Sequence, residues 1–276
     1  MRRLLIRPGG IGDVIVWLPA LESLRADYTE VWVPGPLKPL VRRADRVEAI
    51  AATGLDGFGI PGRQAAPGLI RKLAGFDSIV SWYGGGWEEF PQAVRALNLP
   101  FHFFPALPPP NGPEHAVDYF LTQAKSIGGR NAANAPRIDC CARQQEFAVI
   151  HPFSGSRRKN WPLERFRQVG RELSGRLPVA WCAGPEEDLE EAARFEDLYE
   201  LACWLASARL YIGNDSGITH LAAAVGTPVV ALFGASNPRV WSPRGPHVRV
   251  VSAPSMESIR VEDVIEAVSE ILPRPE

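Results

Sequence analysis

What the 276-residue sequence lacks narrows its function before any motif is considered. Lysine and arginine number 30 against 31 acidic residues, a formal net charge of −1, so there is no basic surplus of the kind that grips nucleic acid. No apolar run approaches the ~20 residues of a membrane-spanning helix. The first six residues hold two arginines and a short apolar stretch, with no signal-peptide core or cleavage site. We therefore expect a cytoplasmic protein that does not bind nucleic acid.

Several catalytic and metal-binding patterns are also absent. The four cysteines have no CxxC spacing and the five histidines are scattered, so we expect no bound metal. The phosphate loop GxxxxGK[ST], the nucleophile elbow GxSxG and the DxD motif do not occur. These absences argue against a P-loop nucleotidase, an α/β-hydrolase and a transferase that holds its nucleotide through a metal on a DxD motif.

What is present is an alternation of short apolar runs with amphipathic stretches, which is typical of parallel α/β sheets. The predicted strands are residues 4–6, 31–33, 79–82, 101–104, 147–150, 178–182, 210–212 and 229–233. The predicted helices are residues 13–25, 114–127, 198–208, 216–225 and 261–272, with two more beginning near 162 and 185. The proline-rich stretch 105–113 is predicted to be a linker or loop. An irregular segment, 131–143, separates two halves, so we expect domains at 1–140 and 141–276.

A glycine-rich turn follows the first predicted strand. In Arg7-Pro8-Gly9-Gly10-Ile11-Gly12-Asp13, the third glycine of a dinucleotide fingerprint is replaced by Ile15, which argues against an NAD-dependent dehydrogenase. Asp13 falls in the first turn of a helix, where a carboxylate is stabilised by the helix dipole but would repel a pyrophosphate. Gly10 and Gly12 let a ligand approach closely. The pattern favours a carboxylate presented for chemistry, although a simple helix cap remains the alternative.

A second loop, from His151 to Pro162, follows a predicted buried strand. Ser154, Gly155 and Ser156 offer hydroxyls and exposed amides, and Arg157, Arg158 and Lys159 supply cations. That combination suits a diphosphate. A solvated basic loop is the alternative, and the loop's place at the carboxyl end of a strand, where α/β sheets bind ligands, argues against it.

The segment Gly213-Asn214-Asp215-Ser216-Gly217-Ile218-Thr219-His220 predicts a strand-to-helix turn that binds phosphate. Asp215 and Ser216 are residue types that cap helices, and Gly217 permits close approach of a ligand to the unsatisfied helix amides. His220 lies one turn into the helix and could equally be a packed side chain. The loop Gly234–Pro238 is expected to line the same site, and Glu187, after another strand, could hold ribose hydroxyls or simply begin a solvated helix.

Together these segments resemble glycosyltransferase family 9, the bacterial lipopolysaccharide heptosyltransferase family. The resemblance is carried by RPGGIGDVIVWLPALESLR, HPFSGSRRKNWPLERF, GPEED and GNDSGITHLAAAVGTPVVALFG. It implies a GT-B fold: two Rossmann-like domains with parallel sheets facing a central cleft, an acceptor-binding domain at 1–140, a donor-binding domain at 141–276, and a terminal helix that packs back on the first domain.

The resemblance also implies roles for individual residues. Asp13 matches the general base, with Gly10 and Gly12 in the acceptor-side loop. The donor-binding residues that it implies are Ser154, Ser156, Lys159, Glu187, Asp215, Ser216, Gly217 and His220. The implied reaction is an inverting transfer of a heptose from ADP-heptose to a lipopolysaccharide-type glycan, with a nucleotide sugar, no further cofactor, and peripheral contact with the inner membrane if the acceptor is lipid-linked.

Two other functions stay open at this point. A GT-B relative could use another nucleotide sugar, for glycan transfer or as an epimerase. A nucleotide-binding protein that has lost transfer activity would bind the ligand without turnover. The sequence does not indicate an oligomeric state.

Overall fold

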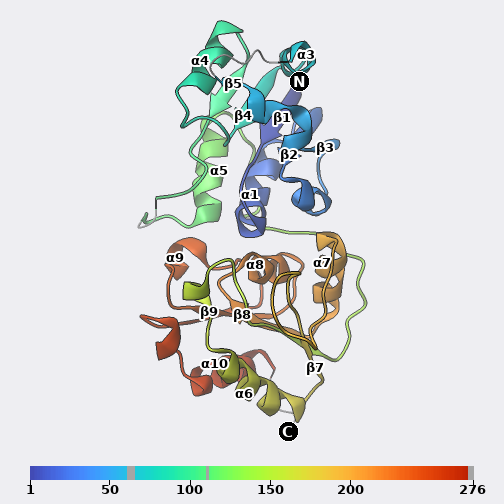
Figure 1. Ribbon diagram of the computed structural model, residues 1–276, viewed down its shortest axis with the longest axis vertical. Coiled ribbons are helices and arrows are strands. Elements are labelled where there is room, and N and C mark those ends of the chain that lie inside the picture. The colour runs from blue at the N-terminus through green and yellow to red at the C-terminus, as the bar shows by residue number, and fades with distance from the viewer. Residues whose placement is uncertain (61–65, 110–111, 273–276) are drawn as a thin grey trace. The chain divides into compact units, whose positions relative to one another are not determined.

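The computed structural model describes residues 1–60, 66–109 and 112–272. The chain divides into two compact units: Met1–Pro109 with Val117–Ala133, and Pro110–Ala116 with Asn134–Glu276 (Figure 1). The division after Ala133 falls inside the irregular segment 131–143, a few residues before the expected boundary at 140. Residues 110 and 111 of the predicted proline-rich loop lie outside the described residues, and its other residues form neither helix nor strand.

The first unit is a five-stranded parallel sheet in the order β3-β2-β1-β4-β5. Its strands are β1 Arg2–Ile6, β2 Tyr28–Val33, β3 Arg46–Ala49, β4 Ser78–Ser81 and β5 Phe101–Phe103. Its helices are α1 Ile11–Leu24, α2 Ile50–Thr53, α3 Pro67–Ala74, α4 Glu89–Ala96 and α5 Ala116–Ser126, with short 3-10 turns η1 Gly35–Leu40 and η2 Leu55–Gly57.

Helices cover both faces of this sheet. On one face Ile6 packs in a cluster with Leu69 of α3 and Phe90 of α4. On the other, Trp82, which follows β4, meets Trp17 of α1 edge-on at 5.4 Å between ring centroids. Strands that are buried on both faces consist of continuous apolar runs rather than alternating apolar and polar residues. Such runs are why the sequence predicts these strands.

The second unit repeats the plan with the strand order β10-β9-β8-β6-β7, again all parallel. Its strands are β6 Ala148–His151, β7 Val179–Trp181, β8 Leu210–Asn214, β9 Val229–Phe233 and β10 Val248–Ser252. Its helices are α6 Leu163–Ser174, α7 Leu198–Ser207, α8 Gly217–Ala224, α9 Pro238–Trp241 and α10 Val261–Ile271, with 3-10 turns η3 Arg157–Lys159 and η4 Met256–Ser258.

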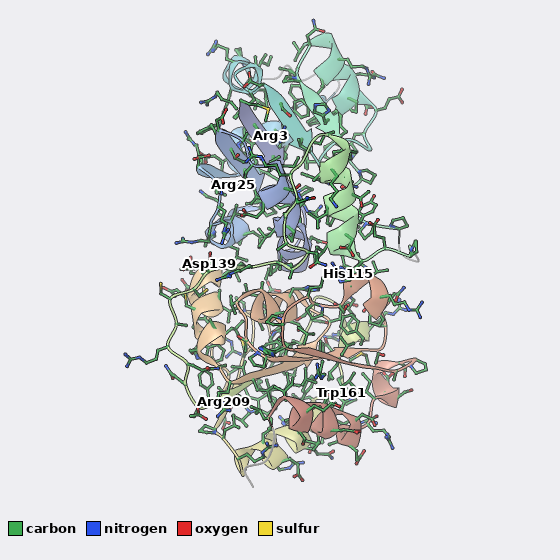
Figure 2. All side chains as sticks on the ribbon, turned by 180° about the vertical axis from the view of Figure 1, so that it is seen from behind. Arg3, Arg25, His115, Asp139, Trp161 and Arg209 are labelled. Atoms are coloured by element: carbon green, nitrogen blue, oxygen red, sulfur yellow. The ribbon has the colours of Figure 1, made fainter. Side chains whose placement is uncertain are left out.

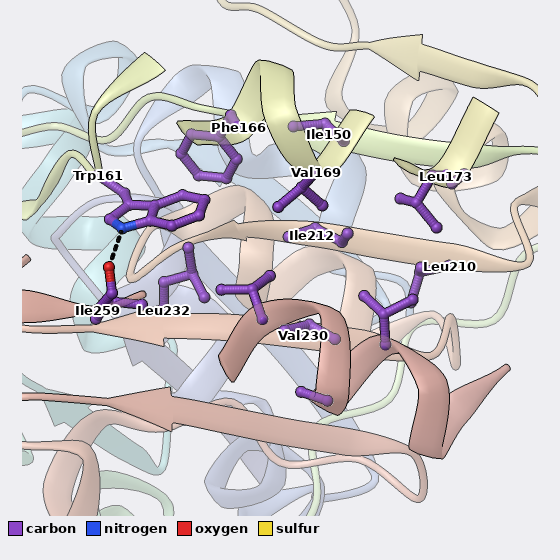
Figure 3. Close-up of a cluster of buried hydrophobic side chains, with 14 of the residues drawn as sticks. Ile150, Trp161, Phe166, Val169, Leu173, Leu210, Ile212, Val230, Leu232 and Ile259 are labelled. Atoms are coloured by element: carbon purple, nitrogen blue, oxygen red, sulfur yellow. Dashed lines mark hydrogen bonds between the residues drawn. The ribbon is translucent and has the colours of Figure 1, made fainter. Parts of the chain in front are cut away.

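One side of the second sheet is closed by α6 and α10. Phe166 and Val169 of α6 lie over Ile212 of β8 in a continuous apolar cluster (Figure 3). Trp161 is 1% exposed and its indole Nε1 donates to the Ile259 carbonyl at 3.1 Å; Figure 2 shows this residue within the second unit. The terminal helix α10 packs against α6 and β10 of its own unit, and the packing on the first domain that the family resemblance implies stays a prediction.

The predicted helix beginning at Pro185 is wrong. Residues 184–192 form turns, and the loop is closed at its ends by hydrogen bonds from the Ala183 amide to the Ala193 carbonyl (3.2 Å) and from the Ala193 amide to the Trp181 carbonyl (2.8 Å). The acidic run here has no apolar stripe of helical period to bury, so the chain extends the sheet edge instead. Among the described helices, none is long and apolar enough to cross a membrane.

Candidate functional site

In the first unit, the glycine-rich turn joins β1 to α1 and places Asp13 in the first turn of the helix, as predicted. The Asp13 carboxylate accepts a hydrogen bond from the Gly10 amide at 2.8 Å, which caps the helix. Gly9 has a φ of +114°, and a Cβ there would lie 2.7 Å from the Asp13 Cβ. Only glycine fits this position. The carboxylate is half-buried, so it is held in one place and still reachable.

The buried Arg7 side chain holds the same turn through hydrogen bonds to backbone carbonyls. Its guanidinium is 1% exposed and donates to the Asp13 carbonyl (Nη2, 2.9 Å) and the Ala106 carbonyl (Nη1, 2.8 Å). It also lies 4.5 Å from the centroid of the Phe120 ring. Burial lowers the pKa of Arg7 to about 10, and the Asp13 charge opposes that shift. The group therefore stays cationic at neutral pH and ties α1 to the segment after β5.

In the second unit, the turn after β8 has the predicted cap. Ser216 is the N-cap of α8, and its hydroxyl accepts from the Thr219 amide at 3.4 Å. Thr219 is also reached by the buried Tyr211 hydroxyl at 3.1 Å. A Cβ on Gly213 would lie 2.5 Å from that hydroxyl, so the strand must carry glycine here. Burial, the dominant effect, raises the pKa of Tyr211.

Lys159 and Asp215 meet although 56 residues separate them in the chain. The Lys159 Nζ lies 2.7 Å from the Asp215 Oδ2, and the Ser236 hydroxyl donates to the same oxygen. Asp215 is 7% exposed and Lys159 is 37% exposed. The Lys159 ammonium is therefore held against a buried carboxylate, while more than a third of the lysine side chain stays exposed.

The loops that carry these residues are joined by Asn214. Its side-chain amide donates to the Pro152 carbonyl at 2.8 Å, and its Oδ1 accepts from the Trp161 amide at 3.0 Å. Within the basic loop, the Ser154 hydroxyl lies 2.8 Å from the Ser156 carbonyl and 2.7 Å from the Asn160 Oδ1. Ser154 thus shapes the loop from inside, while Ser156 is the half-buried residue that precedes η3.

Glu187 lies on the closed loop after β7, next to the end of β6. Its Oε2 accepts from the Gly184 amide at 2.6 Å and lies 3.2 Å from the Nε2 of His151. Burial would raise the pKa of Glu187, but the bonds from His151 and the Gly184 amide outweigh it and lower that pKa. His151 is 3% exposed, and its Nδ1 has no hydrogen-bond partner among the described residues.

The remaining predicted residues are placed as follows. Gly217 is the first residue of α8 and is half-buried, and His220 lies one turn further on, 5% exposed. Gly12 is the second residue of α1. In the second unit the structure brings Lys159, Asp215 and Ser236 together, and places Glu187 with His151, at the carboxyl ends of neighbouring strands. This is the edge at which parallel α/β sheets bind ligands.

Comparison with known proteins decides the family. The model described as "Glycosyltransferase family 9 (heptosyltransferase)" matches residues 114–267, more than half of the chain. The chain belongs to glycosyltransferase family 9. Two solved structures share its fold: glycosyl transferase family 9 from Veillonella parvula (19% identity, 98% of this chain and 97% of that one, TM-score 0.78) and E. coli heptosyltransferase WaaC with ADP (19%, 98% and 100%, TM-score 0.73). At these identities the likeness shows the GT-B fold of two parallel-sheet α/β domains.

The chain is also similar to curated proteins named as lipopolysaccharide heptosyltransferases. Lipopolysaccharide heptosyltransferase 3 of Escherichia coli K12 is 32% identical, but the match spans 38% of this chain and 36% of that protein. Lipopolysaccharide heptosyltransferase 1 of the same strain is 26% identical over 98% of this chain and 100% of that one. The first of these matches thus spans about a third of its relative's length.

The sequence patterns do not predict the contacts of three residues of this family 9 chain. Arg7, His151 and Ser236 stand in segments that the sequence marked, yet their partners lie 99, 36 and 21 residues away. The sequence contains a feature that could have pointed to His151 and Arg7, because each is a polar residue directly at the end of a buried apolar strand. Nothing local to Ser236 distinguishes it from other loop serines.

Proposed function

We propose that the chain is an inverting glycosyltransferase that moves a sugar from a nucleotide diphosphate to a glycan hydroxyl. The observation that carries the proposal is the Lys159–Asp215–Ser236 cluster beside the amino end of α8. An ammonium held by a buried carboxylate, together with the backbone amides at the first turn of a helix, suits a diphosphate. We propose that the loop of Ser154 and Ser156 contributes to the same phosphate site, that Gly217 lets the ligand approach closely, and that His220 is also part of it.

Glu187 is proposed to hold the ribose of the donor. Its Oε2 is occupied by His151 and the Gly184 amide, and no hydrogen bond to its Oε1 is found among the described residues. An ionised carboxylate with one oxygen held and the other open accepts hydrogen bonds from a vicinal diol. The lowered pKa of Glu187 keeps it ionised at neutral pH.

Asp13 is proposed as the general base. The acceptor oxygen attacks the anomeric carbon, the bond from that carbon to the diphosphate oxygen breaks, and the acceptor proton passes to the Asp13 carboxylate. Such proton transfer contributes ~10²–10⁴-fold. Lys159 and the α8 amides meet the charge that develops on the leaving diphosphate, an effect of roughly 3–4 kcal/mol for each well-aimed donor.

The donor and acceptor are proposed to be ADP-heptose and a lipopolysaccharide-type glycan. Support comes from the lipopolysaccharide heptosyltransferases to which the chain is related and from the related WaaC structure with ADP. If the glycan is lipid-linked, the protein works at the inner face of the inner membrane. Calorimetry with ADP, UDP, GDP and CDP, followed by product analysis with the corresponding nucleotide sugars, tests the identity of the donor. Tighter binding of UDP, GDP or CDP than of ADP overturns the proposal of an ADP-sugar donor.

Three variants test the site. Lys159→Ala is expected to weaken ADP binding about 10- to 100-fold, because it removes a charge-assisted contact, whereas Arg158→Ala, on the exposed side of the same loop, leaves it unchanged. Asp13→Asn is expected to keep the ADP affinity and lose turnover. Equal ADP affinity in the two loop variants contradicts the phosphate assignment. Nucleotide binding without turnover in the parent protein indicates a binding protein instead.

A further inference from the structure

The loop between β4 and α4 exposes aromatic surface that the proposed function does not use. Trp87 is 50% exposed, a high value for so large an apolar side chain. Tyr83, half-buried, meets it with ring centroids 4.9 Å apart and planes at 77°. Single exposed apolar residues are common on protein surfaces, so exposure alone identifies nothing. What distinguishes this pair is how it is held and where it lies.

A buried phenylalanine supports the two rings. Phe90, 1% exposed, lies 6.0 Å from the Tyr83 ring and 6.3 Å from the Trp87 ring, between centroids. Gly84 has a φ of +76°, and a Cβ on it would lie 2.8 Å from the Phe90 ring. The Trp87 amide donates to the Gly84 carbonyl at 3.1 Å and closes the turn. The loop is therefore a built support that presents one indole to solvent.

The loop begins beside the turn that carries Asp13. Ser81 of β4 is in register with Ile6 of β1, and the Trp82 amide donates to the Ile6 carbonyl at 3.0 Å. One residue further along each strand, the chain enters the Arg7–Asp13 turn on one side and the Tyr83–Trp87 loop on the other. Both leave the carboxyl edge of the same sheet, where ligands of such sheets bind.

The charges around the loop indicate what it binds. The segment from Trp82 to Phe90 contains no lysine or arginine, and Glu88 and Glu89 beside the indole are exposed. Burial, followed by the nearby Asp56 charge, raises the pKa of Tyr83, so the phenol stays neutral. A phosphate or carboxylate on the ligand would meet repulsion here. A neutral sugar ring can lay its apolar C–H face on the indole and donate hydroxyl hydrogens to the carboxylates.

We propose that Trp87 and Tyr83 form an acceptor subsite that stacks against a neutral sugar ring of the glycan. The inference rests on the proposed glycosyl transfer and specifies the chemistry of the acceptor. The subsite binds a ring that carries no phosphate or carboxylate, beside the hydroxyl that Asp13 deprotonates. Recognition there comes from apolar contact area and hydroxyl hydrogen bonds.

Trp87→Ala tests the subsite against Trp87→Phe, which keeps an aromatic face, and against Leu97→Ala, which removes a 41% exposed apolar side chain outside the loop. Losing the indole face is expected to raise the acceptor KM about 10- to 30-fold, with kcat and ADP affinity unchanged. Trp87→Phe should lose less than half of that effect on a logarithmic scale, and Leu97→Ala none. An unchanged KM in Trp87→Ala overturns the proposal.

Direct binding keeps this test separate from that of the proposed function. Saturation-transfer NMR on the full chain would use lactose, maltotriose and mannotriose as probes, each beside its phosphorylated counterpart. We expect signals from the neutral sugars that Trp87→Ala abolishes. Stronger binding of the phosphorylated sugars, equal binding to parent and Trp87→Ala, or no binding of any neutral sugar would each overturn the subsite. ADP binding and donor hydrolysis without acceptor report on the transferase proposal independently.

Discussion

Replacing Arg7 by methionine measures how much a buried cation contributes to the turn that carries Asp13. Methionine fills much of the same volume and donates no hydrogen bonds. The two shorter bonds of Arg7, at 2.8 and 2.9 Å, come from a charged donor, and such bonds contribute about 1.5–3 kcal/mol each. Removing a buried charge recovers part of its desolvation cost, so we expect a net loss of about 2–4 kcal/mol. For a unit of this size that lowers the unfolding midpoint by about 10 °C.

The assay compares the two units of the same molecule. In differential scanning calorimetry, the unfolding transition of the first unit should occur at a lower temperature in Arg7→Met than in the parent protein. The ADP affinity should stay at the parent value because the proposed nucleotide site lies in the second unit. Turnover should fall about 10²-fold, since a shift of about 1 Å in Asp13, the proposed general base, is expected to have that effect. Arg7→Lys should recover part of both losses. An unchanged midpoint, or a fall in ADP affinity as large as the fall in turnover, would refute this reasoning.

Three further predictions concern the second unit. Gly213→Ala should lower its stability by about 1–3 kcal/mol through overpacking against Tyr211, and adding Tyr211→Phe should restore part of it in a denaturant titration. The folded-state pKa of Glu187 lies below its ordinary value of 4.5, so its ionised form stabilises the fold above that pH. The difference in unfolding free energy between the parent protein and Glu187→Gln should therefore shrink as the pH falls below 4.5. Burial, the largest cause, raises the pKa of the Cys182 thiol to about 12. Iodoacetamide at pH 8 should therefore modify the exposed Cys141 and leave Cys182 unmodified until denaturant is added. Labelling of the two cysteines at the same rate in the folded protein would contradict this prediction.

Sequence patterns predicted most of this fold because its central strands are buried on both faces. The runs at 4–6 and 210–212 appear as strands at nearly those positions, and Asp13 and Ser216 occupy the helix-start positions that their residue types favour. The edge strands β3 and β10 were not predicted, since their residues are partly exposed and polar. The acidic run after Pro185 was assigned to a helix because charge and a leading proline are helix-start signals in any context.

The sequence marks the loops that carry the proposed site residues, but it does not indicate which side chains contact one another. Lys159 and Asp215 both stand in recognisable loops, but nothing in the local sequence indicates that their side chains contact each other. The motif that contains Arg7 does not predict a role for it, because its side chain contacts Ala106, which lies beyond β5. Interactions of this kind depend on which strand ends the topology places together, and strand order is not encoded in any short window of sequence.

The loop that carries Glu187 has its ends tied to each other and to β7 through Ala193. A segment pinned in this way can change length at little energetic expense, since doubling a loop adds only about 0.6 kcal/mol of closure entropy. Residues 184–192 can therefore be treated as an exchangeable cassette. Evolution or protein engineering can alter the residues that we propose to contact the donor's ribose while every strand of the sheet, and the core beneath it, stays as it is.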